Sequence, residues 1–419
     1  MMAPVSRVLP GQVLTIAGFL MAPLATVVPL ALAPLLAVTA LAALACGGHR
    51  DLWRLEAVWP LVVLLALLGS IGAASAAWSI IPLHSLLEGL RFLAISTAGL
   101  ILVAVALDLA PPERDRLGRL FLAGFAAALV ILALAGITRA FWDPAPASGG
   151  LARWLRHFTV FDRGATVLAL AVWVAISSPI VRGHRARAVL LLFVTLLVVL
   201  SLRSRSAMLC LLLGLAVWPV ARWVPRAAAC AIGAVLLALA FIFPVLPLGT
   251  DVVARLHQAV PQFDNSMIHR FAIWHFAIDR IAERPMLGWG LDASRALPGG
   301  SEIIDDPRLP ELAQSEAHWM PLHPHDAALQ WRLELGWPGS VLATLVVLWL
   351  LWRIGFAAPS AERASALALI AGSFVVAMLS YGFWQAWWQS SLWLTGALAI
   401  ALGSRAPPQW EPRAAAAAR

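Results

Sequence analysis

Two polar segments of the chain carry the residue types that could do chemistry. Residues 265–294 and 323–339 place histidine, arginine and carboxylate side chains beside long apolar runs. In the second segment His323 and His325 flank a proline, and this H-x-H spacing puts two imidazoles on one side of an extended chain, as in some zinc sites. The nearby carboxylates and His318 fit no recognised ligand spacing. We therefore do not expect a metal ion here.

Arginine residues also lie near the predicted membrane surface in two other parts of the chain. The candidates are Arg203 and Arg205 in the turn SLRSRS, and Arg153, Arg156, His157 and Arg163 in residues 151–165. A single arginine in such a position usually contacts lipid phosphates. Several arginines that converge on one cleft would instead indicate an anionic ligand.

The first polar segment must be positioned by an amphipathic helix. Asn265 or Ser266 can cap its N-terminus, apolar residues recur at three- and four-residue spacing to Ile281, and Pro285 with the LGWG turn ends it. Arg270 falls at the border of the apolar stripe, from which it can reach sideways along a membrane surface. His275 lies in the stripe and is interpreted as a packing residue.

The second segment leads into a helix that enters the membrane. Pro324 disfavours helix before it, and Asp326 can cap the helix that follows. His325 and Arg332 are two turns apart, so we expect both to face one cavity. Glu334 lies on another face and suits either a substrate contact or a structural role beside a buried arginine or backbone group.

The composition excludes a soluble domain. Of the 419 residues, 61% are hydrophobic and 12% are charged, with a mean hydropathy of +0.84, whereas soluble domains are about half apolar and a quarter charged. The net charge of +8 comes from 30 arginines without a lysine, and no basic run indicates nucleic-acid binding. The three cysteines lie in apolar stretches, so we expect neither disulfides nor thiolate metal sites.

The hydropathy pattern predicts an all-α polytopic membrane protein with about twelve transmembrane helices. Residues 13–46 divide near residue 27 into two spans, and the other spans are 57–77, 90–110, 117–141, 164–181, 187–202, 206–223, 227–248, 332–353, 364–384 and 387–403. The predicted organisation is a bundle of about nine spans (1–248), a mainly helical loop domain (249–331), three C-terminal helices (332–403) and a tail (404–419).

Charges in the short connections predict the orientation. With a cytoplasmic N-terminus, the connections rich in arginine and the tail are cytoplasmic, and the loop domain faces the periplasm of a bacterial inner membrane. Tryptophans at the span ends suit an interfacial belt; they are Trp142, Trp154, Trp331, Trp384, Trp387 and Trp388.

The ordered motifs resemble those of the O-antigen ligase and O-antigen polymerase superfamily of integral membrane glycosyltransferases. HPHDAALQWRLELGWPG resembles the H-x-x-x-L-Q-x-x-x-E-x-G-x-x-G signature, with His325, Leu329, Gln330, Glu334, Gly336 and Gly339 in register. The upstream segment is similar to an Arg-x-x-x-Trp helix followed by Pro-Leu-x-Gly-x-Gly, with Arg270, Trp274, Pro285, Gly288 and Gly290. SLRSRS and FDRGATVLAL resemble further family motifs through Arg205 and Arg163. Departures are Met286, Asp326 and Ser206.

This resemblance implies a GT-C-like fold and a metal-independent, inverting transfer without a cofactor. The donor would be a glycan on undecaprenyl pyrophosphate, and the acceptor a sugar of lipid A-core oligosaccharide for a ligase or another glycan for a polymerase. By the motif match, His325 is the base, and Arg270 and Arg205 stabilise the leaving pyrophosphate. The residues expected to assist in binding are Arg163, Arg203, Arg332, His323 and Glu334.

Two other classes of protein are alternatives. A transporter of lipid-linked sugars would carry charged residues deep in its spans and inverted repeats, and neither is evident in the sequence. A structural scaffold would leave the clustered arginines and histidines without a role. The expected partners are therefore the glycan donor, the acceptor and membrane lipids, with no nucleic acid.

Overall fold

The computed structural model of the chain describes residues 9–141, 158–259, 265–357 and 361–403. Three groups of predictions therefore lie outside the described residues. They are the surface positions Arg153, Arg156 and His157, the aromatic anchors Trp142 and Trp154, and the tail 404–419.

Each predicted span coincides with an apolar helix. These helices are α1 (Pro10–Val27), α2 (Leu32–Ala45), α3 (Trp59–Ala74), α4 (Pro82–Asp108), α5 (Pro111–Phe141), α7 (Phe158–Ser177), α8 (Arg185–Leu202), α9 (Arg205–Trp223), α10 (Pro225–Leu237), α14 (Ala327–Gly355), α15 (Ala361–Leu379) and α16 (Ala386–Gly403). In the described part of the chain, nine helices are long and apolar enough to cross a membrane. The fold is thus that of an all-α, multi-pass membrane protein, and the count of twelve spans stays a prediction.

Proline residues mark where several helices begin. Pro10, Pro82 and Pro225 each occupy the first turn of a helix, where the missing N–H would have no intrahelical partner in any case. The chain between α1 and α2 breaks at Val28, just before Pro29. The predicted division of this long apolar run near residue 27 is therefore confirmed.

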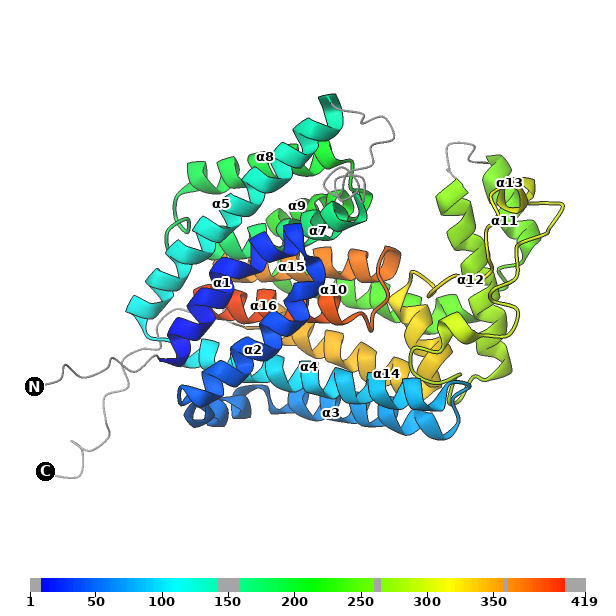
Figure 1. Cartoon of the computed structure of the whole chain (residues 1–419), viewed down its shortest axis with the longest axis horizontal. Helices are drawn as coiled ribbons and strands as arrows, with labels where there is room; N and C mark the ends of the chain where they lie inside the picture. The colour runs from blue at the N-terminus through cyan, green and yellow to red at the C-terminus, as the bar shows by residue number, and fades with distance from the viewer. Residues whose placement is uncertain (1–8, 142–157, 260–264, 358–360, 404–419) are drawn as a thin grey trace, which may run out of the picture.

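Helix α7 is the centre of one half of the bundle. Its residues from Gly164 to Ser177 are buried on every face, because α1, α5, α8, α9, α15 and α16 all pack against it. The other half is built from α3, α4, α10 and α14 (Figure 1). A helix that is apolar all round and has protein on all sides fits the sequence of α7, which has no charge after Arg163.

The four predicted belt tryptophans that lie in described residues belong to this packed interior. Trp331, Trp384, Trp387 and Trp388 are each at most 3% exposed, so the interpretation of these rings as interfacial anchors is wrong. Rings that pack inside the protein cannot lie among lipid head groups. Three of the four tryptophans lie in or next to the short turn between α15 and α16.

The loop domain projects from one end of the bundle, at the right of Figure 1. It contains α11 (Thr250–Ala259), α12 (Asn265–Glu283) and α13 (Pro310–Gln314), and it is mostly irregular after Glu283. Helix α12 begins and ends where the sequence predicted, and it buries Ile268, Trp274, Ile278 and Ile281.

A kink in α14 joins the loop domain to the bundle. Gly336 has φ 61° and ψ −150°, inside a helix that also contains Pro338. Because Pro338 has no N–H and the N–H of Trp337 turns to Met286 O at 3.2 Å, the carbonyl groups of Leu333 and Glu334 lose their helical partners.

The LGWG turn replaces those partners. Trp289 N donates to Leu333 O at 3.0 Å, and Gly290 N donates to Glu334 O at 2.8 Å. A Cβ on Gly336 would lie 2.1 Å from Met286 O, and one on Gly288 would lie 2.5 Å from Glu334 O. The two glycine motifs are therefore the two sides of one close backbone contact, which we call the α14 joint.

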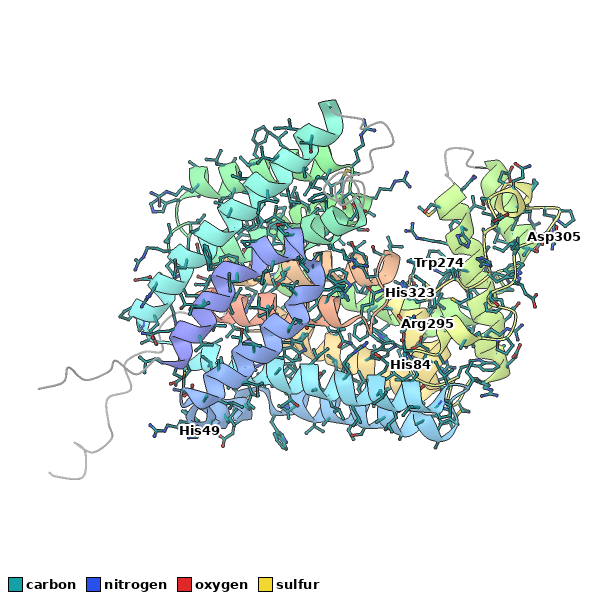
Figure 2. The ribbon with its side chains drawn as sticks, viewed as in Figure 1. His49, His84, Trp274, Arg295, Asp305 and His323 are labelled. Carbon is teal, nitrogen blue, oxygen red and sulfur yellow. The ribbon has the colours of Figure 1, made fainter. Side chains whose placement is uncertain are left out.

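The connections rich in arginine lie at the end of the bundle opposite the loop domain. Arg54 Nη2, in the α2–α3 connection, is 2.5 Å from Asp108 Oδ1 at the end of α4. Figure 2 shows His49 at this end, whereas His84, Arg295 and His323 lie where the bundle meets the loop domain. This distribution agrees with the predicted orientation, in which the two ends face opposite sides of the membrane.

Candidate functional site

His325 occupies a strained position directly before α14. Asp326 is the N-cap of the helix and accepts a hydrogen bond from Leu329 N at 2.9 Å, as predicted. His325 has φ 56°, in the left-handed region that side chains other than glycine rarely adopt. Trp274 Nε1 donates to Pro324 O at 2.9 Å, which fixes α12 beside this segment.

One ring nitrogen of His325 is held by the backbone. Nδ1 lies 2.5 Å from Ser380 O, and because a carbonyl oxygen only accepts, Nδ1 carries the proton. The neutral ring then has its lone pair on Nε2. The tautomer that this contact selects is the one in which Nε2 can accept a proton.

The surroundings of His325 keep the ring neutral. Burial lowers its pKa below the ordinary 6.5, and the positive charge of Arg270 and the ring of His269 lower the pKa further, while the bond to Ser380 opposes this. Arg270 is thus close enough to act on His325 electrostatically. A neutral imidazole beside a fixed cation is the state that a general base needs at neutral pH.

His323 helps to hold the backbone of His325 in place. His325 N donates to His323 Nδ1 at 3.1 Å, and the His323 ring packs against Gly382, where a Cβ would meet ring carbon Cδ2 at 2.8 Å. Burial, His325 and Arg295 lower the pKa of His323 to about 3. A neutral ring that is 6% exposed favours a positioning role for this residue.

The turn from Ser380 to Gln385 brings the predicted motifs together, and the sequence analysis did not identify it. Ser380 Oγ lies 2.7 Å from Ser206 Oγ, next to Arg205. Tyr381 Oη lies 3.3 Å from Thr166 Oγ1, one turn after Arg163. The turn contributes through backbone and hydroxyl groups, so no recognisable pattern of residue types marked it.

The four predicted arginines around this turn are placed differently. Arg163 is half-buried, and its guanidinium carbon lies 5.2 Å from the centre of the Trp387 ring. Arg205 is the first residue of α9 and is exposed, whereas Arg270 is half-buried on α12. Arg203 is exposed in the α8–α9 turn at φ 54°. Arg163 and Arg205 therefore approach the site from α7 and α9, and Arg270 approaches it from the loop domain.

The angle from which the sequence analysis expected Arg332 and His325 to face one cavity does not hold in the structure. The expected angle assumed a helix that includes His325, but α14 begins at Ala327. The Arg332 guanidinium carbon lies 3.6 Å from the centre of the Trp337 ring. It is 4% exposed, and its Nη1 has no hydrogen-bond partner among the described residues.

An apolar groove lies beside Trp337 on the membrane side of the α14 joint. It has a volume of about 450 Å³ and is lined by Leu67, Ile71, Trp337, Pro338, Val341 and Leu342. These residues come from α3 and α14 only, and no polar side chain lines the groove. Its lining suits a hydrocarbon chain.

Glu334 is a structural residue by its contacts. It is fully buried, and its carboxylate accepts from Asp292 N at 2.7 Å, Trp384 Nε1 at 2.5 Å and Gln330 Nε2 at 3.1 Å, and also from the Ser294 hydroxyl. Both carboxylate oxygens are thus used by protein donors. Of the two roles considered for Glu334, the contacts favour the structural one.

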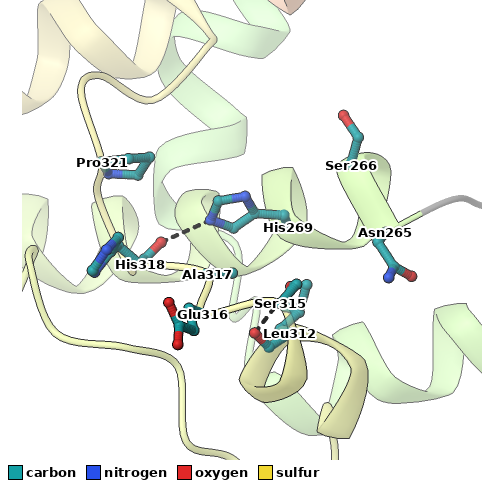
Figure 3. Close-up of a pocket in the computed structure, with 9 residues that line it drawn as sticks. All are labelled: Asn265, Ser266, His269, Leu312, Ser315, Glu316, Ala317, His318 and Pro321. Carbon is teal, nitrogen blue, oxygen red and sulfur yellow. Dashed lines mark hydrogen bonds between the residues drawn. The ribbon is translucent and has the colours of Figure 1, made fainter. Parts of the chain in front are cut away.

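A polar hollow lies on the loop domain next to His269 (Figure 3). Its volume is about 350 Å³, and it is lined by Asn265, Ser266, His269, Leu312, Ser315, Glu316, Ala317, His318 and Pro321. His269 Nε2 contacts His318 O at 2.7 Å, which fixes the ring at the wall of this hollow. Since His269 also influences the pKa of His325, the hollow adjoins the site.

Together, fold and site define a class of protein. It is a multi-pass membrane protein with a neutral histidine, several arginines and a polar hollow at one end of an apolar bundle. This class includes enzymes that act on lipid-linked, anionic substrates at a membrane surface.

Comparisons with known proteins narrow the class. Residues 188–344 match the family described as O-Antigen ligase. A candidate polysaccharide ligase of Rickettsia prowazekii is 31% identical over 241 residues, 57% of this chain and 58% of the relative. Counterparts in Rickettsia conorii and Rickettsia felis are each 31% identical, over 56% of both chains. The matched region thus spans somewhat more than half the length of these relatives.

These matches agree with the resemblance that the motifs predicted, because the matched residues are similar to the O-antigen ligase family and to relatives named as polysaccharide ligases. The family match contains α9 with Arg205, α12 with Arg270, and His325 with the first part of α14. All three residues that the resemblance predicted to be catalytic lie inside it.

Proposed function

We propose that this protein is a glycosyltransferase that moves a glycan from undecaprenyl pyrophosphate to a sugar of lipid A-core oligosaccharide at the periplasmic face of the inner membrane. The observation that carries the proposal is the state of His325. Its Nδ1–H is bonded to Ser380 O, its lowered pKa keeps it neutral, and Arg270 lies close to it.

In this reaction the acceptor hydroxyl group gives its proton to His325 Nε2 as its oxygen attacks the anomeric carbon of the donor sugar. The bond from that carbon to the pyrophosphate oxygen breaks on the opposite side, so one displacement inverts the anomeric centre. The leaving pyrophosphate gains negative charge, and fixed guanidinium groups stabilise it. Arg270 and Arg205 have this role, and Arg163 and Arg203 assist in binding.

The apolar groove and Arg332 suit the lipid part of a substrate. A buried guanidinium without an acceptor is costly, and a phosphate oxygen would supply the acceptor that Arg332 lacks. The groove next to it takes a hydrocarbon chain without exposing polar groups. We assign Arg332 and the groove to the lipid-phosphate portion of the donor, and the hollow beside His269 to the acceptor glycan.

The test is transfer by the purified full chain, reconstituted with an undecaprenyl-pyrophosphate-linked glycan, with and without a lipid A-core acceptor. Transfer should require the acceptor, continue with a chelator present, and fall by about 10²- to 10⁴-fold in His325→Ala, the usual contribution of a general base. Arg270→Ala should also lose transfer.

The matched control is His275→Ala, on the same helix as Arg270. Its Nδ1 lies 3.6 Å from Asp279 Oδ2, and its ring centre lies 6.0 Å from that of Trp319. Neither partner has a role in the proposed reaction, so transfer should be retained. Wild-type rates in both His325→Ala and Arg270→Ala would refute the mechanism. A ladder of products from donor alone would identify a polymerase that uses the same site, and loss of transfer with chelator would refute its metal independence.

A further inference from the structure

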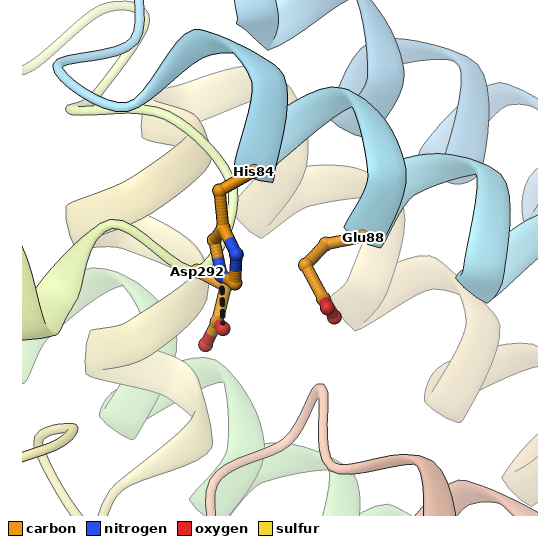
Figure 4. A group of neighbouring side chains, drawn as sticks. All are labelled: His84, Glu88 and Asp292. Atoms are coloured by element: carbon orange, nitrogen blue, oxygen red, sulfur yellow. Dashed lines mark hydrogen bonds and ion pairs between the residues drawn. The ribbon is translucent and has the colours of Figure 1, made fainter.

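A second group of ionisable side chains lies at the same end of the bundle, outside the proposed transfer site. His84 and Glu88 are on α4, and Asp292 follows the LGWG turn of the loop domain. Figure 4 shows the three side chains converging on one space between the two elements. No sequence motif identified this group, because 204 or more residues separate Asp292 from the other two.

The geometry of this group suits a cation. His84 and Glu88 are four residues apart and so share one face of α4. His84 Nε2 lies 2.8 Å from Asp292 Oδ2, and one ligand atom from each residue lies within 4.8 Å of the others. Atoms that share a cation at about 2.2 Å lie within about 4.4 Å of each other, so side-chain movements of a few tenths of an ångström would close the site.

Glu88 is the buried member of the group. It is 8% exposed, and its Oε2 is buried without a hydrogen bond among the described residues. The same Oε2 forms an ion pair with Arg91 Nη2, one turn further along α4. A divalent cation that displaced Arg91 would supply the positive charge that this buried carboxylate needs.

Two arginines pair with the carboxylates of this group, and a bound cation would replace them there. Arg91 pairs with Glu88, and Arg295 Nη2 lies 3.6 Å from Asp292 Oδ2. Their side chains are 40% and 52% exposed, so Arg295 can turn toward solvent. Arg91 Nη2 also donates to Trp384 O at 2.8 Å, and this bond can remain when a cation replaces Arg91 at Glu88. His84 is 41% exposed, which leaves a path for an ion to enter and positions open for water ligands.

The backbone of Asp292 is also held in place by a hydrogen bond to α14. Its N–H donates to Glu334 Oε2 at 2.7 Å, and its φ of 54° directs the side chain toward α4. A ligand whose backbone is fixed in this way is one of the supports that metal sites use.

We propose that His84, Glu88 and Asp292 form a binding site for a divalent cation such as Mn²⁺, which ties the first turns of α4 to the α14 joint. One imidazole and two carboxylates fit this ion class. The site is separate from His325 and the arginines, so the proposal does not depend on the transfer reaction and is compatible with transfer in chelator.

The test is a titration of the purified full chain with Mn²⁺ after chelator treatment, with the signal of free Mn²⁺ followed by electron paramagnetic resonance and no glycan present. We expect one ion per chain and a rise in the thermal midpoint. Glu88→Gln and His84→Ala should each weaken binding at least tenfold. Arg91→Gln should strengthen it, because the competing charge is gone.

The control is again His275→Ala, which removes a histidine–carboxylate pair with no third ligand and should bind Mn²⁺ as the wild type does. The Glu88→Gln variant keeps the shape of the side chain, so its loss of binding cannot be attributed to misfolding if its thermal midpoint without metal is unchanged. A wild type that binds no Mn²⁺, or equal binding in Glu88→Gln and His84→Ala, would overturn the proposal.

Discussion

Replacing Gly336 with alanine adds a methyl group where the α14 joint has no space for one. We expect this substitution to destabilise the joint. The new Cβ would lie 2.1 Å from Met286 O and 2.7 Å from Leu287 N, both backbone atoms that cannot swing away. The φ of 61° with ψ of −150° is a region essentially restricted to glycine. The strain costs about 1–3 kcal/mol, and the forced shift of the LGWG turn costs about 1–3 kcal/mol more.

The expected change in thermal midpoint follows from the size of the chain. An unfolding entropy of about 2.1 cal/mol/K per residue gives roughly 0.9 kcal/mol/K for 419 residues. A loss of about 2–6 kcal/mol therefore lowers the midpoint by roughly 2–7 °C. The measurement is thermal unfolding in detergent, followed by size-exclusion chromatography of the surviving fraction.

Gly396→Ala is the matched control for this substitution. Gly396 lies inside α16, and no atom is within 4 Å of its added Cβ, so alanine should be neutral or raise the stability by up to about 1 kcal/mol. If Gly336→Ala and Gly396→Ala both unfold at the wild-type temperature, the joint does not have the rigidity inferred from these contacts.

Three further predictions concern buried groups. His323 is neutral when folded, with a pKa of about 3 against 6.5 when unfolded, so its contribution to stability is complete above pH 6.5 and falls by about 1.4 kcal/mol per pH unit below that; His323→Gln should flatten this slope in unfolding measured from pH 7 to pH 5. Arg332→Met should leave the stability unchanged or raise it by about 1–4 kcal/mol, since it removes a buried charge without an acceptor, yet lower transfer at least tenfold; full transfer would exclude Arg332 from substrate binding. Glu334→Ala leaves four donors unsatisfied and should cost about 3 kcal/mol or more, with Glu334→Gln intermediate; equal midpoints for the two variants would contradict the hydrogen-bond assignment.

The features that could be predicted from the sequence are those encoded in neighbouring residues. Helix α12 from Asn265 to Glu283 and the Asp326 cap depend on spacing and on local capping chemistry, and both are present as expected. The break between α1 and α2 follows from Pro29, whose effect is equally local. Composition indicated a membrane protein, and the lengths of the apolar runs indicated an all-α fold.

The features that were missed depend on contacts between distant residues. Ser380 acts on His325 through its carbonyl oxygen, 55 residues away, and any residue type has a carbonyl group there. The convergence of Asp292 on α4 required knowledge of how the LGWG turn docks. The angle predicted between His325 and Arg332 failed because the left-handed residue precedes the helix instead of belonging to it.

The turn from Ser380 to Gln385 also has a consequence for how the protein is made. A chain elongated only through α14 already contains His325 and Arg270, but it lacks the carbonyl oxygen that selects the ring tautomer of His325. The site is therefore complete only after the α15–α16 hairpin has been inserted. Synthesis of the α15–α16 hairpin, which follows that of the loop domain, is thus the step that completes the proposed site.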